Sequence, residues 1–247
     1  MQCYKADLHI HTVLSPCGDL EMSPANIVSK AVEAQLDIIG ITDHNSTLHA
    51  PLVRDLALRH DIMTLMGAEV TSREEVHCLC FFEFDSELNE FQRWIDALLP
   101  EIPLDEERFG YQVVVNEQEE ITAQLPYLLT SAIDADIDAV YDKVHSLNGL
   151  FIPAHVNREA NSLTSQLGFV PVDLRADGLE ISRHVKKHEF IKKNAYLKRF
   201  GFIQSSDAHY IDSIGQTYCH AVMDHKDFSE FRLALQAKEG RYIENIK

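Results

Sequence analysis

Asp7-Leu8-His9-Ile10-His11-Thr12 is the stretch from which the fold of this chain can be read. An apolar lead-in precedes it, so residues 3–10 are predicted to form a β-strand. Residues two apart in a strand point to the same face, and we therefore expect His9 and His11 side by side at the strand end. Two imidazoles placed in this way can bind one divalent metal ion. Taken alone, a His-x-His pair is equally compatible with ordinary surface or core histidines.

Later strands are predicted to carry metal-binding side chains at their ends as well. Helices predicted over residues 24–34, 49–60 and 136–147 separate apolar strands, and this alternation favours a parallel α/β sheet or barrel. In an α/β barrel the functional residues gather at the carboxyl ends of the strands. The side chains found at such positions, or near the start of the strand at 76–82, are Asp43, His44, Glu69, His77, His155, Asp207 and His209.

This set of side chains offers only nitrogen and oxygen donors. Imidazole together with carboxylate suits zinc, manganese or iron. A carboxylate such as Glu69 can bridge two metal ions, which an imidazole does not normally do. Six histidines and three carboxylates exceed the needs of one ion, so the set predicts two or three.

Composition limits the classes of protein that the chain can belong to. Its 247 residues suit one large α/β domain, and no run of about 18 apolar residues predicts a transmembrane helix. No signal-peptide pattern is present, and five cysteines without framework spacing suit a reducing cytoplasm. A net charge of −17 disfavours binding of long nucleic acid, although bound cations would reverse the charge locally.

With these motifs the sequence resembles the polymerase and histidinol phosphatase (PHP) superfamily. The resemblance rests on Asp7–Thr12, Ile41-Thr42-Asp43-His44, Pro153-Ala154-His155 and Ser206-Asp207-Ala208-His209. It extends to Gly67-Ala68-Glu69 and to His77, and so covers most of the chain.

The resemblance implies a fold and a cofactor. The fold would be a distorted (β/α)7 barrel, similar to a TIM barrel, that holds a trinuclear metal site. We expect a single PHP domain over residues 1–247. The irregular segment 83–130 is interpreted as an insertion or cap, because the alternation of strands and helices resumes after it.

Carried over by position, the resemblance also implies which residues bind each metal. The first ion would be held by His9, His11, Glu69 and Asp207. The second would share Glu69 and add His77 and His155. The third would be held by Asp19, His44 and His209. The loop that contains Asp19 is longer than the common form in the family, and Cys17 is the alternative ligand.

The resemblance implies hydrolysis of a phosphate ester by water bridging two metals, without a covalent intermediate on the protein. Glu69, Asp207 and His209 would be the catalytic residues. We expect a cytoplasmic phosphoesterase acting on a small phosphorylated substrate or a short nucleotide, with no membrane partner. The alternatives are a 3′/5′ exonuclease or nucleotide phosphatase on short oligonucleotides, a non-catalytic metal-binding scaffold, and an amidohydrolase.

Other polar residues near the predicted strand ends have two readings. Arg158 and Arg183 are predicted to bind substrate phosphate at the rim, where the alternative is a solvated loop charge. Asp43 either orients a ligand or caps a helix. A basic helix is expected over residues 188–200. Its run 192–199 could guide an anionic substrate but resembles an ordinary solvated helix face. Residues expected to be surface, structural or ordinary are Glu180, His184, His188, His49, His60, His145, His220 and His225.

Overall fold

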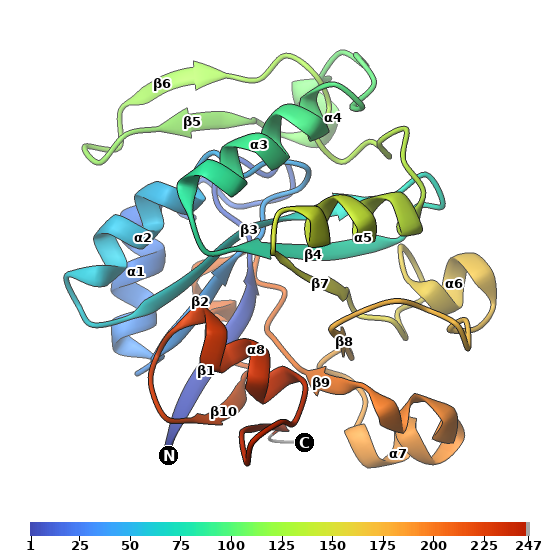
Figure 1. Cartoon of the computed structure of the whole chain (residues 1–247). Coiled ribbons are helices and arrows are strands. Elements are labelled where there is room, and N and C mark those ends of the chain that lie inside the picture. The colour runs from blue at the N-terminus through green and yellow to red at the C-terminus, as the bar shows by residue number, and fades with distance from the viewer. Residues whose placement is uncertain (246–247) are drawn as a thin grey trace.

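The computed structural model describes residues 1–245 and shows a mixed α/β fold built on a curled sheet (Figure 1). The sheet has seven strands, and its third through sixth strands in space come from the amino-terminal half of the chain. In spatial order they are β11 (Tyr242–Asn245), β10 (Cys219–Met223), β1 (Gln2–Ile10), β2 (Ile38–Ile41), β3 (Met63–Thr71), β4 (His77–Phe82) and β7 (Leu150–Pro153).

A parallel pair, β8 (Gly178–Glu180) and β9 (Gly201–Ile203), closes the curled sheet toward a barrel. On one side the backbone N–H of Val156, just after β7, donates to the carbonyl of Glu180 at 2.8 Å. On the other side the segment after β9 meets the end of β1, where Ala208 pairs with Ile10. The ring that surrounds the centre therefore consists of seven strands, β1, β2, β3, β4, β7, β8 and β9, which confirms the predicted distorted (β/α)7 barrel.

The strand directions differ from the prediction at β4. Strands β1, β2 and β3 are parallel, but β4 is antiparallel to both β3 and β7. The expectation of a parallel sheet is wrong here because only the short turn 72–76, and no helix, joins β3 to β4. The reversal places His77, the first residue of β4, opposite Thr71 at the end of β3. It therefore brings His77 to the edge where the parallel strands end.

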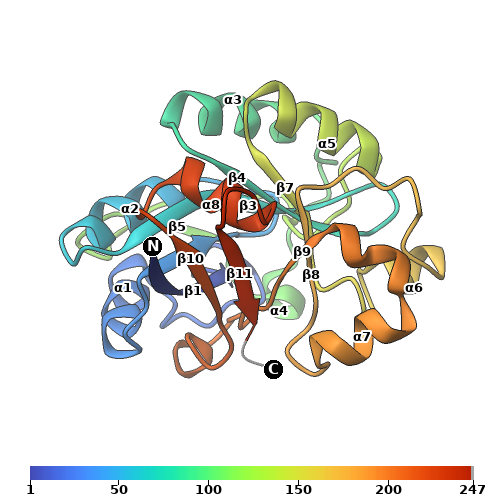
Figure 2. The same cartoon turned by 60° about the horizontal axis from the view of Figure 1, so that its bottom comes forward.

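The helices cover the sheet and are anchored by apolar side chains. In α1 (Pro24–Glu33) the Ser23 side chain accepts from the N–H of Asn26, and Ile27 and Val28 are buried against the sheet. A second buried cluster, on the other side of the strands, packs against α8 (Phe228–Leu235) (Figure 2). The remaining helices are α2 (Ala50–Leu58), α3 (Asp85–Asp96), α4 (Glu106–Phe109), α5 (Ile137–Ser146), α6 (Leu163–Leu167), α7 (Lys187–Lys193), and the 3-10 helices η1 (Ala195–Arg199) and η2 (Ile211–Ser213).

Two segments differ from simple expectation. The helix expected over 188–200 is interrupted at Asn194, whose φ and ψ of −126° and 56° separate α7 from η1. Segment 83–130 contains α3 and α4, and it ends with the separate hairpin of β5 (Val113–Val115) and β6 (Ile121–Gln124), which stands above the sheet in Figure 1. Within residues 1–245 no helix has the length and apolar character needed to cross a bilayer.

Candidate metal centre

The predicted metal-binding side chains converge on one buried site at the strand ends. Glu69 lies at its centre and is only 1% exposed. Its Oε1 is 2.9 Å from Nδ1 of His77, 3.1 Å from Nε2 of His155 and 3.3 Å from Nε2 of His9. Its Oε2 is 3.2 Å from Nδ1 of His44 and 3.4 Å from Nε2 of His11. One carboxylate therefore contacts five imidazoles that come from β1, β2, β4 and β7 or the residues just after them.

Asp207 and His209 complete the same site from the segment after β9. Oδ1 of Asp207 is 3.5 Å from Nε2 of His9, 3.6 Å from Nε2 of His11 and 3.6 Å from Nδ1 of His209. The backbone of Asp207 has a positive φ of 52°, and that of His155 a positive φ of 28°. Such conformations are uncommon for residues other than glycine and gather at functional sites.

These distances fit divalent metal ions. In a tetrahedral site with ligand atoms about 2.1 Å from the ion, neighbouring ligand atoms lie about 3.4 Å apart. Three donor groups have ligand atoms that all lie within 4.8 Å of one another: His9 with His11 and Glu69, His44 with Glu69 and His77, and His11 with His44 and His209. Nδ1 of His44 and Nδ1 of His77 are buried and lack a hydrogen-bond partner, although both lie close to Glu69. A cation site requires such an arrangement, in which the lone pairs of several ligand atoms point to one place and are not used in hydrogen bonds.

The electrostatics of the site also favour a bound cation. Burial alone would raise the pKa of Glu69, but His77 and His9 outweigh it and hold that pKa well below its usual range. Burial lowers the pKa of His44 well below its usual range, with help from the neighbouring His11. Burial and His11 lower the pKa of His209 to about 4. At neutral pH the site thus combines an ionised carboxylate with neutral imidazoles at His44 and His209, the forms that bind metal. In His9 and His11 burial lowers the pKa, but the nearby carboxylates of Glu69 and Asp207 outweigh it and raise that pKa, so a cation would have to displace a proton there.

Glu180 contacts the predicted metal-binding side chains, although the sequence analysis expected it to be structural. Its Oε2 lies 3.0 Å from Nδ1 of His9 and accepts a hydrogen bond of 2.9 Å from the backbone N–H of His155. A carboxylate on Nδ1 fixes the tautomer of His9 and leaves Nε2 free to face Glu69. Glu180 ends β8, and this strand-end position was the signal available in the sequence.

Asp43 orients the loop that follows His11. Its Oδ1 accepts from the backbone N–H of Thr12 and from the hydroxyl of Ser15, both at 2.7 Å. The Ser15 hydroxyl lies 3.1 Å from Nδ1 of His11. The reading of Asp43 as a helix cap is wrong, because α2 begins at Ala50 with His49 at its N-cap position.

His49 was expected to be ordinary, yet it is buried beside this loop. Its Nδ1 lies 2.6 Å from Oγ1 of Thr12, and its Nε2 accepts from the backbone N–H of Val115 at 2.9 Å. Nothing in its local sequence marks it, because both partners are distant along the chain.

Asp19 and Cys17 lie at the margin of the site. The backbone N–H of Asp19 donates to the carbonyl of His209 at 2.8 Å, while its carboxylate accepts from the N–H of Glu21. Neither side chain belongs to the three donor groups found among the described residues. The assignment of Asp19 to a third ion therefore stays a prediction.

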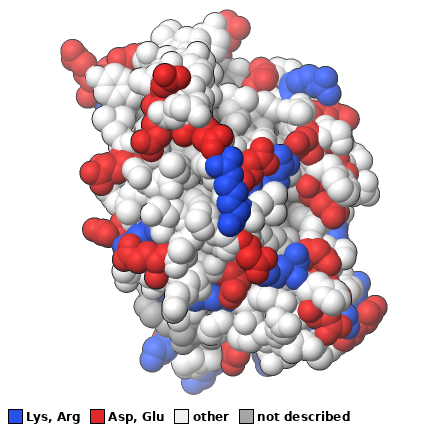
Figure 3. All heavy atoms as spheres, turned by 90° about the vertical axis from the view of Figure 1, so that its left-hand side faces the viewer, with Lys and Arg blue, Asp and Glu red and all other residues white. Residues whose placement is uncertain are grey.

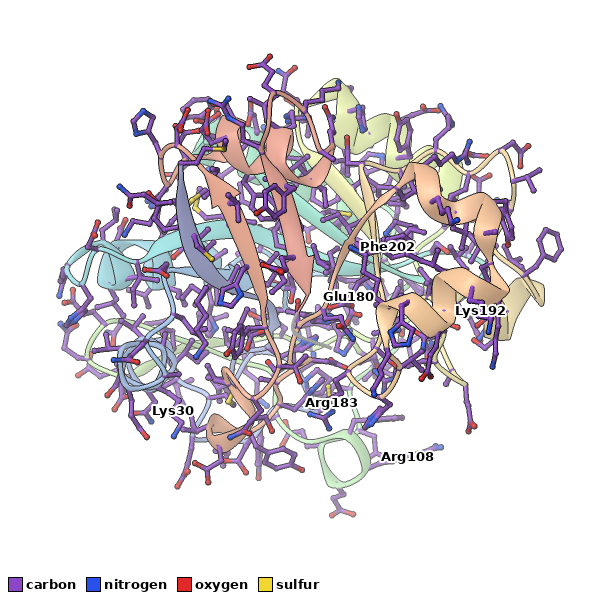
Figure 4. All side chains as sticks on the ribbon, turned by 90° about the horizontal axis from the view of Figure 1, so that it is seen from below. Lys30, Arg108, Glu180, Arg183, Lys192 and Phe202 are labelled. Carbon is purple, nitrogen blue, oxygen red and sulfur yellow. The ribbon has the colours of Figure 1, made fainter. Side chains whose placement is uncertain are left out.

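A small pocket of about 80 Å³ opens beside the donors and contains both predicted substrate-binding arginines. His155 and Asp207 form one wall, and Arg158, Arg183 and His184 lie around the rest. Nη1 of Arg158 is 2.5 Å from Oδ2 of Asp207. Nη1 of Arg183 donates to the carbonyl of Ser206 at 3.3 Å. Figure 4 shows Arg183 and Glu180 on the side of the molecule seen from below.

Comparison with known families and proteins gives consistent matches. A family model described as "PHP domain" matches residues 7–159. The uncharacterized protein YqxK of Bacillus subtilis is 25% identical over an alignment of 273 residues, which covers 96% of this chain and 63% of YqxK. The uncharacterized protein MJ1587 of Methanocaldococcus jannaschii is 31% identical over 78 residues, covering 28% of this chain and 46% of MJ1587.

Solved structures share the fold. The lesion-specific endonuclease PfuEndoQ from Pyrococcus furiosus superposes with a TM-score of 0.70 at 18% identity, over 98% of this chain and 58% of that chain. An Endonuclease Q complex with a 27-mer duplex containing an abasic lesion gives 0.68 at 19% identity, with the same coverage. A protein described as a metal-dependent phosphoesterase from Bifidobacterium adolescentis gives 0.58 at 17% identity, covering 83% of this chain and 87% of that one. The chain thus spans less than two thirds of the Bacillus and Pyrococcus proteins that it matches.

Proposed function

The chain belongs to the PHP domain family, and on this premise we propose that it is a metal-dependent hydrolase of phosphate esters, which cleaves phosphate monoesters or short nucleotide phosphodiesters. The observation that carries the proposal is the position of Glu69, whose two oxygens contact imidazoles on both sides. A carboxylate so placed is suited to bridge two cations. Water would attack the phosphorus directly, without a covalent intermediate on the protein.

We assign the ligands as three sets. The first is His9, His11, Glu69 and Asp207; the second is Glu69, His77 and His155; the third is Asp19, His44 and His209. Zinc, manganese or iron suits these donors, with two or three ions per chain. Bound cations of this kind lower the pKa of water and offset charge on phosphoryl oxygens.

The protein's own side chains would have three further roles: catalysis, binding of the phosphoryl group and orientation of the metal ligands. Glu69, Asp207 and His209 are the proposed catalytic residues, because they fix the positions of the reacting groups. Arg158 and Arg183 would bind the phosphoryl oxygens in the adjoining pocket. The volume of about 80 Å³ suits one phosphoryl group better than a large ligand. Glu180 and Asp43 would hold His9 and His11 in their ligand tautomers.

A second candidate function is nuclease activity on short oligonucleotides. The observation that favours it is the fold shared with an endonuclease that has been solved on DNA. A non-catalytic scaffold is disfavoured, because the buried donor set is intact. We retain amidohydrolase activity only as an outcome of the substrate test.

We also propose that residues 1–247 form one PHP domain in which 83–130 is a cap. Its hairpin contacts the site loop through Val113, Val115 and Val13, which form a small apolar cluster. All five cysteines are free thiols, which suits a reducing compartment such as the cytoplasm.

A substrate screen on metal-reconstituted protein tests the proposed function. It compares an aryl phosphate, sugar phosphates, histidinol phosphate, nucleotides, short oligonucleotides and an aryl amide. We expect hydrolysis of phosphate compounds, and its loss in His155→Ala and in Asp207→Ala. Unchanged hydrolysis in both variants would remove the proposed site, and cleavage of the amide alone would establish the amidohydrolase.

A further inference from the structure

Positive charge in this acidic chain is concentrated in one short segment beside the pocket. Residues 183–199 carry seven lysines and arginines and one acidic residue, Glu189. The segment therefore has a charge of +6, so the rest of the chain carries −23. The seven cations are Arg183, Lys186, Lys187, Lys192, Lys193, Lys198 and Arg199.

These seven cations differ from most others in the chain because none is paired with a carboxylate. Within the described residues no ion pair to an acidic side chain is found for any of them. Nine lysines and arginines elsewhere do form such pairs, namely Lys30, Arg54, Arg59, Arg73, Lys143, Arg158, Arg175, Lys226 and Arg241. By contrast, the face drawn in Figure 3 carries basic side chains among more numerous acidic ones. Lys187 is half-buried over the ring of Phe202, and Arg183 and Arg199 donate to backbone carbonyls. The charge of the four exposed lysines, Lys186, Lys192, Lys193 and Lys198, is thus available to an external anion.

The fold presents this charge outward. Phe190 and Leu197 are buried and anchor α7 and η1 to the core. The break at Asn194 turns η1 away from the axis of α7, so that Lys192 and Lys198 both line an open groove of about 530 Å³. Figure 4 shows Lys192 on the outer side of this helical segment.

The basic segment is continuous with the candidate active site. Arg183 lines the pocket that His155 and Asp207 also line, and α7 begins at Lys187. A monoester that fits inside the pocket would not contact the basic side chains that lie beyond it. They are suited to a substrate that continues outward with further phosphates.

We propose that Arg183, α7 and η1 form a binding surface for a single nucleic acid strand whose scissile phosphate lies in the pocket. The proposal rests on the proposed function and names its substrate class. A duplex is disfavoured because Glu69 is 1% exposed and the pocket holds only about 80 Å³. The net charge of −17 does not prevent one strand from binding to this segment. Salt screens the distant acidic side chains, and the segment that contacts the strand is itself positive.

Tyr196 supports a strand over a lipid surface. It is the one large apolar or aromatic side chain within 183–199 that is strongly exposed, at 42%. Its hydroxyl donates to the carbonyl of Val170 at 2.9 Å, which fixes the ring as a platform on which a base could stack. Insertion into a membrane would instead use exposed apolar side chains, whereas Phe190 and Leu197 are buried.

The test measures binding of a fluorescein-labelled phosphorothioate dT12 strand to metal-reconstituted protein by anisotropy over a series of KCl concentrations. We expect the charge reversals Lys192→Glu and Lys193→Glu, made together, to weaken binding at least tenfold. Loss of two phosphate contacts should also reduce the slope of log K against log salt by about 1.4. The matched control, Arg93→Glu with Lys238→Glu, makes the same change in net charge at exposed cations outside the segment and should bind as the wild type does.

Three other binding outcomes would overturn the proposal. Equal weakening in both variants would show a general effect of net charge, and no weakening in either would leave the segment without a role. Binding to phosphatidylserine vesicles but not to dT12 would assign it to a membrane. Circular dichroism and thermal unfolding verify that the variants fold. Hydrolysis of an aryl phosphate by the wild type is measured separately, so strand binding without hydrolysis would refute the proposed function and not the surface.

Discussion

The imidazole of His49 accepts a hydrogen bond from the backbone N–H of Val115, with 2.9 Å between nitrogen atoms. Because Nε2 accepts, the neutral ring must carry its proton on Nδ1, which lies 2.6 Å from Oγ1 of Thr12. The Thr12 hydroxyl in turn donates to Oδ2 of Asp43 at 2.8 Å. The hairpin strand β5 is thereby linked to the loop after β1.

The hydrogen bonds of Asp43 also determine which nitrogen of His11, a predicted metal ligand, carries the proton. Ser15 donates its hydroxyl proton to Asp43 at 2.7 Å, so its oxygen must accept from Nδ1 of His11 at 3.1 Å. That arrangement leaves the lone pair on Nε2 of His11, the nitrogen that lies 3.4 Å from Glu69. Docking of the hairpin and the ligand tautomer of His11 therefore belong to one hydrogen-bond network.

We predict that His49→Ala weakens both the fold and metal binding. The substitution leaves the buried N–H of Val115 without a partner, which should lower the free energy of unfolding by about 1–3 kcal/mol. Urea unfolding and a metal titration measure the two effects. The exposed His60→Ala should change the free energy of unfolding by less than about 0.5 kcal/mol. Normal metal affinity in His49→Ala would show that the hairpin and the site are independent.

Glu180→Gln should lower metal affinity while leaving the overall fold intact. The amide keeps the shape of the side chain but removes the negative charge that supports His9 through Nδ1. Loss of such an outer carboxylate typically costs about 10–100-fold in metal affinity or activity. Competition with a chromophoric chelator measures the affinity, and Glu189→Gln on the exposed part of α7 serves as control. Equal affinities in the two variants would contradict the role given to Glu180.

Metal binding should stabilise the folded chain through Glu69. A ligand present at one hundred times its dissociation constant stabilises the native state by about 2.7 kcal/mol if it does not bind the unfolded chain. We therefore expect Mn²⁺ or Zn²⁺ to raise the thermal midpoint of chelator-stripped wild type, and not that of Glu69→Gln. The same rise in both proteins would mean that the metal binds elsewhere.

Arg183→Ala should raise KM for an aryl phosphate by about 10–100-fold, because a hydrogen bond to a charged group contributes about 1.5–3 kcal/mol. The effect on kcat should be smaller, since Arg183 contacts the carbonyl of Ser206 and no predicted metal ligand. Steady-state kinetics separate the two constants. Arg183→Lys keeps the charge but not the planar fork, and should recover part of the loss. A fall in kcat alone would place Arg183 in a different role.

The sequence predicted most of the strands, but not all of their directions. Strand β1 and the buried run in β2 were recognisable because apolar patterning is local. The reversal of β4 was overlooked, although the short turn 72–76 leaves no room for a crossover helix between β3 and β4. The pairing of β4 with β7 was not recognisable, because it joins residues some seventy positions apart in the chain. Asn194 interrupts the predicted basic helix through a non-helical backbone conformation, and its side-chain amide donates to the carbonyl of Phe190.

By itself the sequence determined the chemistry of the donors and their places at strand ends, because residue type and periodicity are properties of short stretches. Only the tertiary structure decided which donors meet at Glu69, since His155 lies 86 residues away from it along the chain. It also decided that Glu180, Asp43 and His49 support the ligands, and that the basic segment adjoins the pocket. Those relations depend on long-range packing and strand register, which bring together atoms that no local pattern connects.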